Sequence, residues 1–368
     1  MILEIAALAL AGAHFGVPLL YYFYLKRRYL GRPWGIGIDG NYRPKVTVVV
    51  PTYNEAELIR DRLDNVYAQD YPRALMEIIV VDSASRDGTA ELVRRWASEH
   101  GDVDLKLIEE PERRGKSVAL NTALRHATGE VVVIADVDAR WPSKDTLGEA
   151  VKWFSDPRVG AVSCLKEPAG EGPAGVEGGY RQYYNVLRLA ESRAWSTPIF
   201  HGELAAFRRE LLERIGGFPE DIGADDSHTA TRIALMGYRA IIPEDVVAVE
   251  RVPARGYHAW RIRRAQHLLQ HFARSLGLAR GAPGGFRGFL VAEAYLHLVN
   301  PWLLALAAAL LLASAAAGSP AAAALLLAGL ALLALRPYRA WVAAQAYLLA
   351  AALRNLWTKE IAWEKQRK

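Results

Sequence analysis

The fold is decided by one stretch, VTVVVPTYNE, which occupies residues 46–55. Its first five residues form a continuous, largely β-branched run, which is typical of a strand buried on both faces of a parallel sheet. Pro51 ends this run, and apolar residues then recur at helical spacing between Ile59 and Val66. The stretch therefore predicts a buried strand followed by a helix, which is the beginning of a βαβ unit.

The same pattern recurs up to residue 134. Buried strands are predicted at residues 78–81, 105–108 and 131–134, and helices around Leu92 and over Lys116–Ala127. Alternating strands and helices indicate a doubly wound α/β sheet. Ligands of such sheets bind beyond the carboxyl ends of the strands. Because polar residues directly follow three of the predicted strands, we expect the functional site at that edge.

The composition excludes intrinsic disorder and two cysteine-based architectures. Hydrophobic residues make up 52% of the chain and charged residues 23%, which excludes intrinsic disorder. A single cysteine, Cys164, excludes an intrachain disulfide framework and a cysteine metal cluster. The apolar residues are concentrated at both ends of the chain, which favours a membrane protein over a wholly soluble one.

The chain divides into four predicted parts. These are a transmembrane helix at 1–25, a globular α/β domain at 40–250, a basic amphipathic segment at 255–285, and a second transmembrane region at 290–357 with about three segments. Within the globular domain we expect a strand at 159–165 and, from its Gly, Pro and Glu content, a mobile loop at 167–179.

Charges next to the first apolar segment predict its orientation. Lys26, Arg27 and Arg28 follow it, whereas a secretory signal carries its positive charge in front. We therefore expect an uncleaved anchor in the cell membrane, with the globular domain in the cytoplasm. A buried core helix is the alternative. The last apolar segment either spans the membrane or lies in its interface, because a fourth span would leave the basic tail from Lys359 outside.

The segment at 255–285 combines an apolar stripe with many arginines. Eight arginines and no acidic residue occur between Arg251 and Ala292. This pattern predicts an amphipathic helix that anionic lipid attracts to the cytoplasmic interface; a helix packed on the globular domain is the alternative. The net charge of +5 and the pI of about 9.2 would also suit nucleic acid. The basic run adjoins a membrane segment, so we expect no nucleic-acid partner.

Two carboxylates follow the strand at 131–134. Asp136 and Asp138 stand two residues apart at the ligand edge of the sheet, and hard oxygen ligands suit Mg²⁺ or Mn²⁺. Such ions complete their coordination with substrate phosphates. A solvated turn is the alternative for this pair taken alone.

Three further groups at the same edge suit a nucleotide. Residues 51–55 offer an aromatic ring and a carboxylate for a base and a ribose, and Asp82 can accept hydrogen bonds from a base. Arg114 and Lys116 precede a predicted helix, whose N-terminus favours an anion. The alternatives are an Asx turn for Asp82 and a basic surface turn for Arg114 and Lys116. All of these groups together in one α/β layout favour a nucleotide-binding site.

In this order, the motifs VPTYNE, VDSASRDGT, RGKSVALN and ADVD resemble those of the family 2 glycosyltransferases, which have the GT-A fold. The resemblance covers about residues 45–242. The terminal segments resemble the integral-membrane branch of that family, which includes polyprenol-phosphate mannose synthases and the cellulose, chitin and hyaluronan synthases. The motif set is specific for transfer from a nucleotide-sugar and is weak for the identity of the sugar.

The resemblance implies roles for the matching residues of the donor site. The residues that would hold the nucleoside are Pro51, Tyr53, Glu55 and Asp82. Lys116, with Arg114, would face the diphosphate. Asp136 would contact the nucleotide-sugar, and Asp138 would bind the metal, which neutralises charge on the departing diphosphate.

The resemblance also implies an acceptor side. The stretch at 200–209, with Gly202, looks like the family's acceptor segment, and Asp225 and Asp226 stand at the place of its catalytic acidic pair. By this match Asp226 is the general base of a single displacement that inverts the anomeric carbon. A helix N-terminal cap is the alternative for the pair.

Polymer-extending members carry Gln-x-x-Arg-Trp after this point. The closest stretch here begins at Gln266 and lacks both the arginine and the tryptophan, although Trp260 could replace the latter from a different position. Processive synthesis is therefore doubtful.

These observations predict an inverting, metal-dependent membrane hexosyltransferase with a lipid-linked or glycan acceptor. The resemblance favours mannose from GDP-mannose over a UDP-hexose. The alternatives are a processive polysaccharide synthase that uses a UDP-hexose and a catalytically inactive membrane scaffold. A sugar nucleotidyltransferase would need a Gly-rich, Arg-containing loop after the first strand, which residues 51–54 do not supply.

Overall fold

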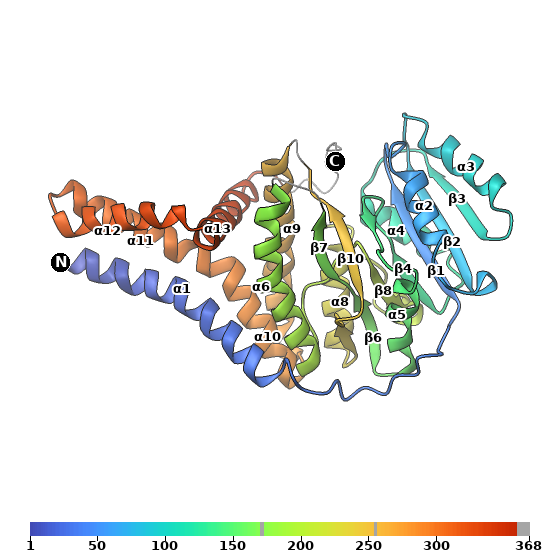
Figure 1. The fold of residues 1–368 in the computed structure, drawn as a ribbon, viewed down its shortest axis with the longest axis horizontal. Helices are drawn as coiled ribbons and strands as arrows, with labels where there is room; N and C mark the ends of the chain where they lie inside the picture. The colour runs from blue at the N-terminus through green and yellow to red at the C-terminus, as the bar shows by residue number, and fades with distance from the viewer. Residues whose placement is uncertain (170–172, 254–255, 359–368) are drawn as a thin grey trace.

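The computed structural model describes residues 1–169, 173–253 and 256–358 (Figure 1). Its main sheet has seven strands in the order β3-β2-β1-β4-β8-β6-β9. Their bounds are β1 Val46–Thr52, β2 Met76–Ser83, β3 Asp104–Glu110, β4 Val131–Ile134, β6 Val159–Ser163, β8 Ala205–Arg208 and β9 Arg239–Ile241. Strands β1 to β4 are mutually parallel, whereas β8 runs antiparallel to both neighbours, β4 and β6. The predicted doubly wound sheet is thus confirmed and is mixed.

Strand β1 shows why this sequence forms a two-sided sheet. Val48 lies opposite Ile78 of β2 and Val133 of β4, and it is fully buried. Successive side chains of a strand point to opposite faces. Val48 therefore packs in the core under helices α2 and α3, whereas Val49 packs in the core under α4 and α8.

Helices cover both faces of the main sheet. They are α2 Ile59–Tyr67, α3 Thr89–Glu99, α4 Lys116–Leu124, α5 Thr146–Val151, α7 Arg209–Arg214 and α8 Asp225–Leu235, with short 3₁₀ turns at Arg73–Leu75, Lys152–Ser155 and Ala279–Gly281. Buried aromatic residues such as Trp96 fill the layer between helices and sheet. This packing leaves the carboxyl edge of β1, β2 and β4 open toward the rest of the molecule.

A second sheet corrects part of the sequence-based expectation. It has the order β5-β10-β7, with β5 Ala139–Arg140, β10 Val247–Arg251 and β7 Leu165–Ala169. The expected single strand at 159–165 is split at Cys164, and its second part joins β10 in the smaller sheet. The prediction of a mobile loop at 167–179 is wrong for the part of this range that the structure describes, because β7 extends to Ala169 and helix α6 covers Pro173–Ala194.

The apolar ends of the chain form a group of helices beside the α/β domain. They are α1 Ile2–Arg28, α10 Gly284–Ala294, the π-helix η4 Tyr295–Val299, α11 Asn300–Ala316, α12 Pro320–Ala331, η5 Leu332–Ala334 and α13 Arg336–Arg354. Two stretches, Ile2–Arg28 and Gly284–Ala316, are long and apolar enough to cross a membrane. The pair Pro320–Ala334 and Arg336–Arg354 is bent by 108° and counts as a third only if it forms one broken span. The basic tail from Lys359 lies outside the described residues.

Helices α6 and α9 (Tyr257–Leu278) lie between the sheets and the apolar helices (Figure 1). Helix α9 packs against α13, α10 and α8; its apolar residues Trp260, Ala265, Leu269 and Phe272 are buried, whereas Leu276 is exposed. The helix is therefore packed within the protein, and its attraction to anionic lipid remains a prediction. Two of its arginines and one that precedes it pair with carboxylates elsewhere in the chain: Arg264 pairs with Glu250, Arg274 with Asp221, and the preceding Arg251 with Asp61.

Candidate active site

A cavity of about 430 Å³ opens at the carboxyl edge of the main sheet. One end is lined by residues that follow β1 and β4 and by the beginnings of α4 and α8. The other walls come from α6, α9 and α13. The cavity thus lies where the sequence predicts a ligand site, between the α/β domain and the apolar helices.

The nucleoside end is built on the loop after β1. Pro51, Tyr53 and Glu55 line the cavity, as expected. The guanidinium of Arg113 lies 3.9 Å from the centre of the Tyr53 ring, which is cation–π geometry. Arg114, which was expected to face the diphosphate, is half exposed and pairs with Glu110 at 3.6 Å. Among the described residues, Arg113 and not Arg114 lines the cavity, and a contact of Arg114 with a diphosphate remains a prediction. Neighbouring arginines at a turn point in different directions, and their order alone does not say which one faces the cavity.

Asp82 has a different position from the one expected. It is 3% exposed and accepts hydrogen bonds from the backbone N–H of Ser85 at 3.0 Å and from its hydroxyl at 2.5 Å. Among the described residues, the cavity is lined by Ser83 and not by Asp82. Asp82 therefore forms the Asx turn that the sequence analysis gave as its alternative, and a contact with a base remains a prediction.

The loops after β1 and β2 brace each other. Asn54 has a positive φ of 54°; its backbone N–H donates a hydrogen bond to Ser85 Oγ at 2.7 Å, and its side-chain oxygen accepts one from the backbone N–H of Arg86 at 2.8 Å. Asparagine tolerates this left-handed conformation better than most residues. The bracing fixes the loop that carries Tyr53 and Glu55.

Lys116 joins the two acidic motifs of the site. Its ammonium lies 2.8 Å from Asp136 Oδ1 and 3.2 Å from Asp225 Oδ2. Burial alone would lower the pKa of Lys116, but the carboxylates of Asp136 and Asp225 outweigh it and raise the pKa above its usual range. The lysine is thus held charged at the first turn of α4, where the helix N-terminus also favours an anion.

Asp136 and Asp138 both line the cavity and fit a divalent cation. Within the described part of the chain, no group of three or more His, Cys, Asp or Glu side chains could hold a metal on its own. A cation at Asp138 therefore requires further oxygen ligands from a substrate, as Mg²⁺ and Mn²⁺ commonly do with phosphates.

Gly202 lies against the Lys116–Asp136 pair. A Cβ atom at Gly202 would stand 2.6 Å from Lys116 Nζ and 2.7 Å from Asp136 Oδ2. Gly202, which was expected on the acceptor side, therefore leaves room for the Lys116–Asp136 ion pair of the donor site.

Asp226 lies at the start of α8 and faces the cavity. Burial and the neighbouring Asp225 raise its pKa to about 7, against the opposing effect of Lys116. Asp225 is 4% exposed and is held by Lys116. The two neighbouring aspartates thus have different surroundings, and Asp226 is the one suited to accept a proton near neutral pH.

Of the two expected acceptor residues, Trp260 lines the cavity and Gln266 does not. Gln266 is fully buried outside the cavity wall, and its amide nitrogen lies 3.4 Å from both Asn355 Oδ1 and Thr358 O. Trp260 lines the cavity but is 1% exposed, with the guanidinium of Arg264 at 4.7 Å from its ring centre. A ring covered in this way offers no open face for a sugar.

Arg263 is a site residue that the sequence analysis assigned to lipid. It lines the cavity and forms no hydrogen bond or ion pair with the described residues. Burial, with the charges of Arg264 and Arg113 nearby, lowers its pKa to about 10, while Asp136 acts in the opposite sense. The sequence offered one signal for this residue, the positions of Arg263 and Arg264 on a predicted helix. Which side of that helix faces the cavity is decided by the tertiary structure.

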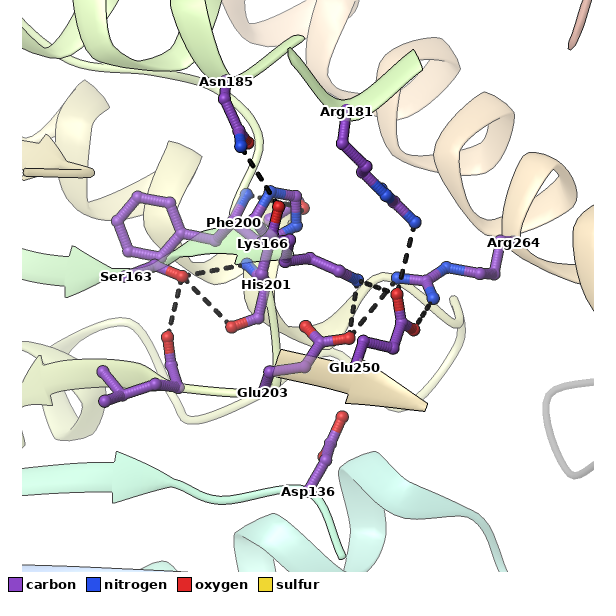
Figure 2. Close-up of polar contacts among 12 residues, drawn as sticks. Asp136, Ser163, Lys166, Arg181, Asn185, Phe200, His201, Glu203, Glu250 and Arg264 are labelled. Atoms are coloured by element: carbon purple, nitrogen blue, oxygen red, sulfur yellow. Dashed lines mark hydrogen bonds and ion pairs between the residues drawn. The ribbon is translucent and has the colours of Figure 1, made fainter. Parts of the chain in front are cut away.

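Five charged residues form a buried ion cluster beside the cavity (Figure 2): Lys166, Glu203, Glu250, Arg264 and Arg181. Lys166 is fully buried and lies 2.5 Å from Glu203 and 3.1 Å from Glu250. Glu250 also pairs with Arg264 of α9 and, at 3.3 Å, with Arg181 of α6. Burial alone would raise the pKa of Glu203, but Lys166 and Arg264 hold it below its usual range. The cluster thus links helix α6, through Arg181, and helix α9, through Arg264, to Glu250 of strand β10.

Comparisons with known proteins agree with this geometry. Residues 47–216 match the family model described as glycosyl transferase family 2. The chain is 65% identical to a mannosyltransferase from Pyrobaculum calidifontis, solved in complex with GDP-Man and Mn²⁺; the match covers 97% of this chain and 100% of the other, with a TM-score of 0.91.

Curated relatives are more distant. Glycosyltransferase AglE of Haloferax volcanii is 29% identical over 215 residues, which are 58% of this chain and 68% of AglE. A poly-β-1,6-N-acetyl-D-glucosamine synthase of Staphylococcus epidermidis is 24% identical over 60% of this chain, and the match spans about half of that synthase, 53%.

Proposed function

The chain belongs to glycosyl transferase family 2 and is a hexosyltransferase of GT-A fold, and we propose that it transfers mannose from GDP-mannose to an acceptor at a membrane surface. The observation that carries the donor assignment is the 65% identity, over 97% of the chain, to a mannosyltransferase in complex with GDP-Man and Mn²⁺. The cavity supports it, because its residues supply a place for each part of such a donor.

The donor lies along the carboxyl edge of the sheet. The base packs near the Tyr53–Arg113 pair. The negatively charged diphosphate lies near the positive charges of Lys116 and Arg263 and near the N-terminus of α4. Asp138, with Asp136, would hold the divalent cation. When bound, the cation supplies positive charge that offsets the charge developing on the leaving diphosphate.

Asp226 acts as the general base. Its carboxylate accepts the proton of the acceptor hydroxyl while that oxygen forms a bond to the anomeric carbon. The bond between this carbon and the diphosphate oxygen breaks on the opposite side, and GDP leaves with the electron pair. This single displacement inverts the anomeric carbon.

The apolar helices support a membrane location with the catalytic domain in the cytoplasm. Helix α1 exposes many large apolar side chains and ends in Lys26, Arg27 and Arg28, next to the catalytic domain. An acceptor that is lipid-linked, or a glycan presented at the membrane, fits this placement. The covered ring of Trp260 disfavours a processive synthase, and the complete set of Asp136, Asp138 and Asp226 disfavours an inactive scaffold.

A donor panel tests the proposal. The detergent-solubilised protein is incubated with GDP-mannose, UDP-glucose or UDP-N-acetylglucosamine, and released nucleotide is measured with Mn²⁺ and with excess chelator. We expect Mn²⁺-dependent release of GDP and much slower release of UDP. Faster release from a UDP-sugar would contradict the donor assignment, and release that is unaffected by chelator would contradict the metal.

A further inference from the structure

The catalytic base is carried by the segment that leads into α8. Residues 223–227 of this segment line the cavity, and Asp226 is the second residue of the helix. One side of the segment is held by Lys116, 3.2 Å from Asp225, and by Ser227, whose hydroxyl accepts a hydrogen bond from the backbone N–H of Phe200 at 3.1 Å. Another side faces helix α9. The backbone of this segment decides where the Asp226 carboxylate lies.

One polar face of α9 contacts this segment. The face consists of residues at the i, i+3, i+4, i+7 and i+8 spacing of a helix: His267, Gln270, His271, Arg274 and Ser275. Gln270 Oε1 accepts a hydrogen bond from the backbone N–H of Gly223 at 3.3 Å, and Ser275 Oγ lies 3.3 Å from His228 Nδ1. Arg274 pairs with Asp221 at the surface. The face thus follows the chain from Asp221, before the base, to His228, after it.

His267 packs directly against Gly223. A Cβ atom at Gly223 would stand 2.2 Å from both Cδ2 and Nε2 of His267, so no side chain fits between this backbone and the ring. Burial lowers the pKa of His267 to about 3, and the charges of Arg263, Arg264 and Lys116 act in the same sense. The ring is therefore neutral at neutral pH. It holds the segment by van der Waals contact and not by an ion pair with the aspartates.

Gln270 links the same glycine to the C-terminal apolar helix. Its amide nitrogen donates a hydrogen bond to Oδ1 of Asn355, the residue after α13, at 3.0 Å, while its amide oxygen accepts the one from Gly223. Both ends of the amide are thus used, which fixes its orientation. Among the described residues that line the cavity, Gln270 is absent, so its effect on the reaction is indirect.

We propose that His267 and Gln270 of α9 are positioning residues for the catalytic base: they hold the backbone at Gly223 and thereby set the place of the Asp226 carboxylate. This inference rests on the proposed function, because it concerns the general base of the same transferase. A displacement of about 1 Å can slow a reaction by ~10²-fold. Most of the proposed donor contacts lie on the loops after β1 and β4 and on α4. A small shift at Gly223 should therefore lower kcat without raising the KM for GDP-mannose.

Two replacements of Gln270 test the hydrogen bond. Turnover of GDP-mannose with water as acceptor is measured in the detergent-solubilised protein with Mn²⁺, together with the Kd for GDP. Gln270→Met has a similar length and no acceptor oxygen, so we expect kcat to fall by ~10-fold or more while the KM and the Kd stay unchanged. Gln270→Glu keeps an oxygen that accepts from Gly223 and should recover most of the lost kcat. An unchanged kcat in Gln270→Met, or an equal loss in Gln270→Glu, would overturn the proposal.

A pair of substitutions tests the packing. Gly223→Ala places a methyl group against the His267 ring and should lower kcat by ~10-fold or more. Adding His267→Ala removes the ring, so the double variant should turn over faster than Gly223→Ala alone, a coupling that independent sites do not show. A double variant that is no faster would also overturn the proposal. If Gly223→Ala does not fold, the Gln270 variants still decide.

Arg274→Gln is the matched control, because it removes an exposed ion pair between α9 and Asp221 of the same segment and should leave kcat and the KM unchanged. A loss of kcat in this control equal to that of Gln270→Met would count against a specific role for Gln270. Failure of the unsubstituted protein to release GDP from GDP-mannose would instead refute the proposed function.

Discussion

At the scale of single residues, Gly202 sets a limit on the donor site. A side chain here would meet the Lys116–Asp136 pair at less than 3 Å. We expect Gly202→Ala to separate that pair, so that GDP binding weakens while the protein keeps its fold. Titration with GDP and a thermal unfolding curve measure the two effects. Gly101→Ala is the control, since nothing lies within 4 Å of its Cβ position. Normal GDP binding by Gly202→Ala would show that the pair does not serve the donor.

Asp226 leads to a prediction about pH. Its pKa is raised to about 7, so the carboxyl is protonated below that pH and becomes a base above it. The rate of GDP-mannose turnover at low donor concentration should therefore rise from pH 6 to pH 8. Asp226→Asn keeps the size of the side chain and should lower the rate by ~10²–10⁴-fold, because a general base contributes that much. A rate that is independent of pH in this range, with normal activity of Asp226→Asn, would assign the base elsewhere.

Part of the site could be predicted from the sequence. Asp136, Asp138 and Lys116 lie at a strand end or a helix start, where the fold class decides their location, whereas Asp226 is implied by the resemblance to the family; all four line the cavity. The directions of the Arg113 and Asp82 side chains depend on the local backbone path of a loop. Neighbouring arginines differ in direction, and Asp82 has a local partner in Ser85 that competes with any ligand.

At the scale of elements, helix α9 brings a second source of charge to the donor site. Arg263 forms no ion pair with the described residues and lies near Asp136. We expect Arg263→Gln to weaken GDP binding by roughly 10- to 100-fold, the usual effect of losing a hydrogen bond to a charged group. Arg274→Gln, on the same helix, removes an exposed ion pair with Asp221 and should change little. Equal effects of the two variants would argue against a specific role for Arg263.

Helix α6 shows why some elements could not be predicted. Its first residues, Pro173 to Gly179, are rich in glycine and indicate a loop by local propensity. Tertiary packing overrides this preference, because α6 lies against α1 and α13 and supplies Arg181 and Arg188 to ion pairs of other elements. Such contacts join residues that are far apart in the sequence. The buried strand β1 is the opposite case, since its own β-branched run suffices.

At the scale of the whole molecule, the apolar helices and the α/β domain meet around one cavity. Helices α6 and α9 lie between them, and the buried ion cluster joins both helices to the sheets (Figures 1 and 2). The sequence predicts the two kinds of region and their order. It does not predict that Arg251, Arg264 and Arg274 form ion pairs, because their carboxylate partners Asp61, Glu203 and Asp221 lie outside residues 251–292.

The most direct test of the central claim is the configuration of the first mannose released when GDP-mannose is turned over with water as acceptor. GDP-mannose carries an α-linked sugar, and a single displacement with Asp226 as base gives β-mannose first. Proton NMR recorded during the reaction, before the two anomers interconvert, distinguishes them. We predict β-mannose in the earliest spectra with Mn²⁺ present, and no release by Asp138→Asn. Release of α-mannose first, or equal release by Asp138→Asn, would contradict the account.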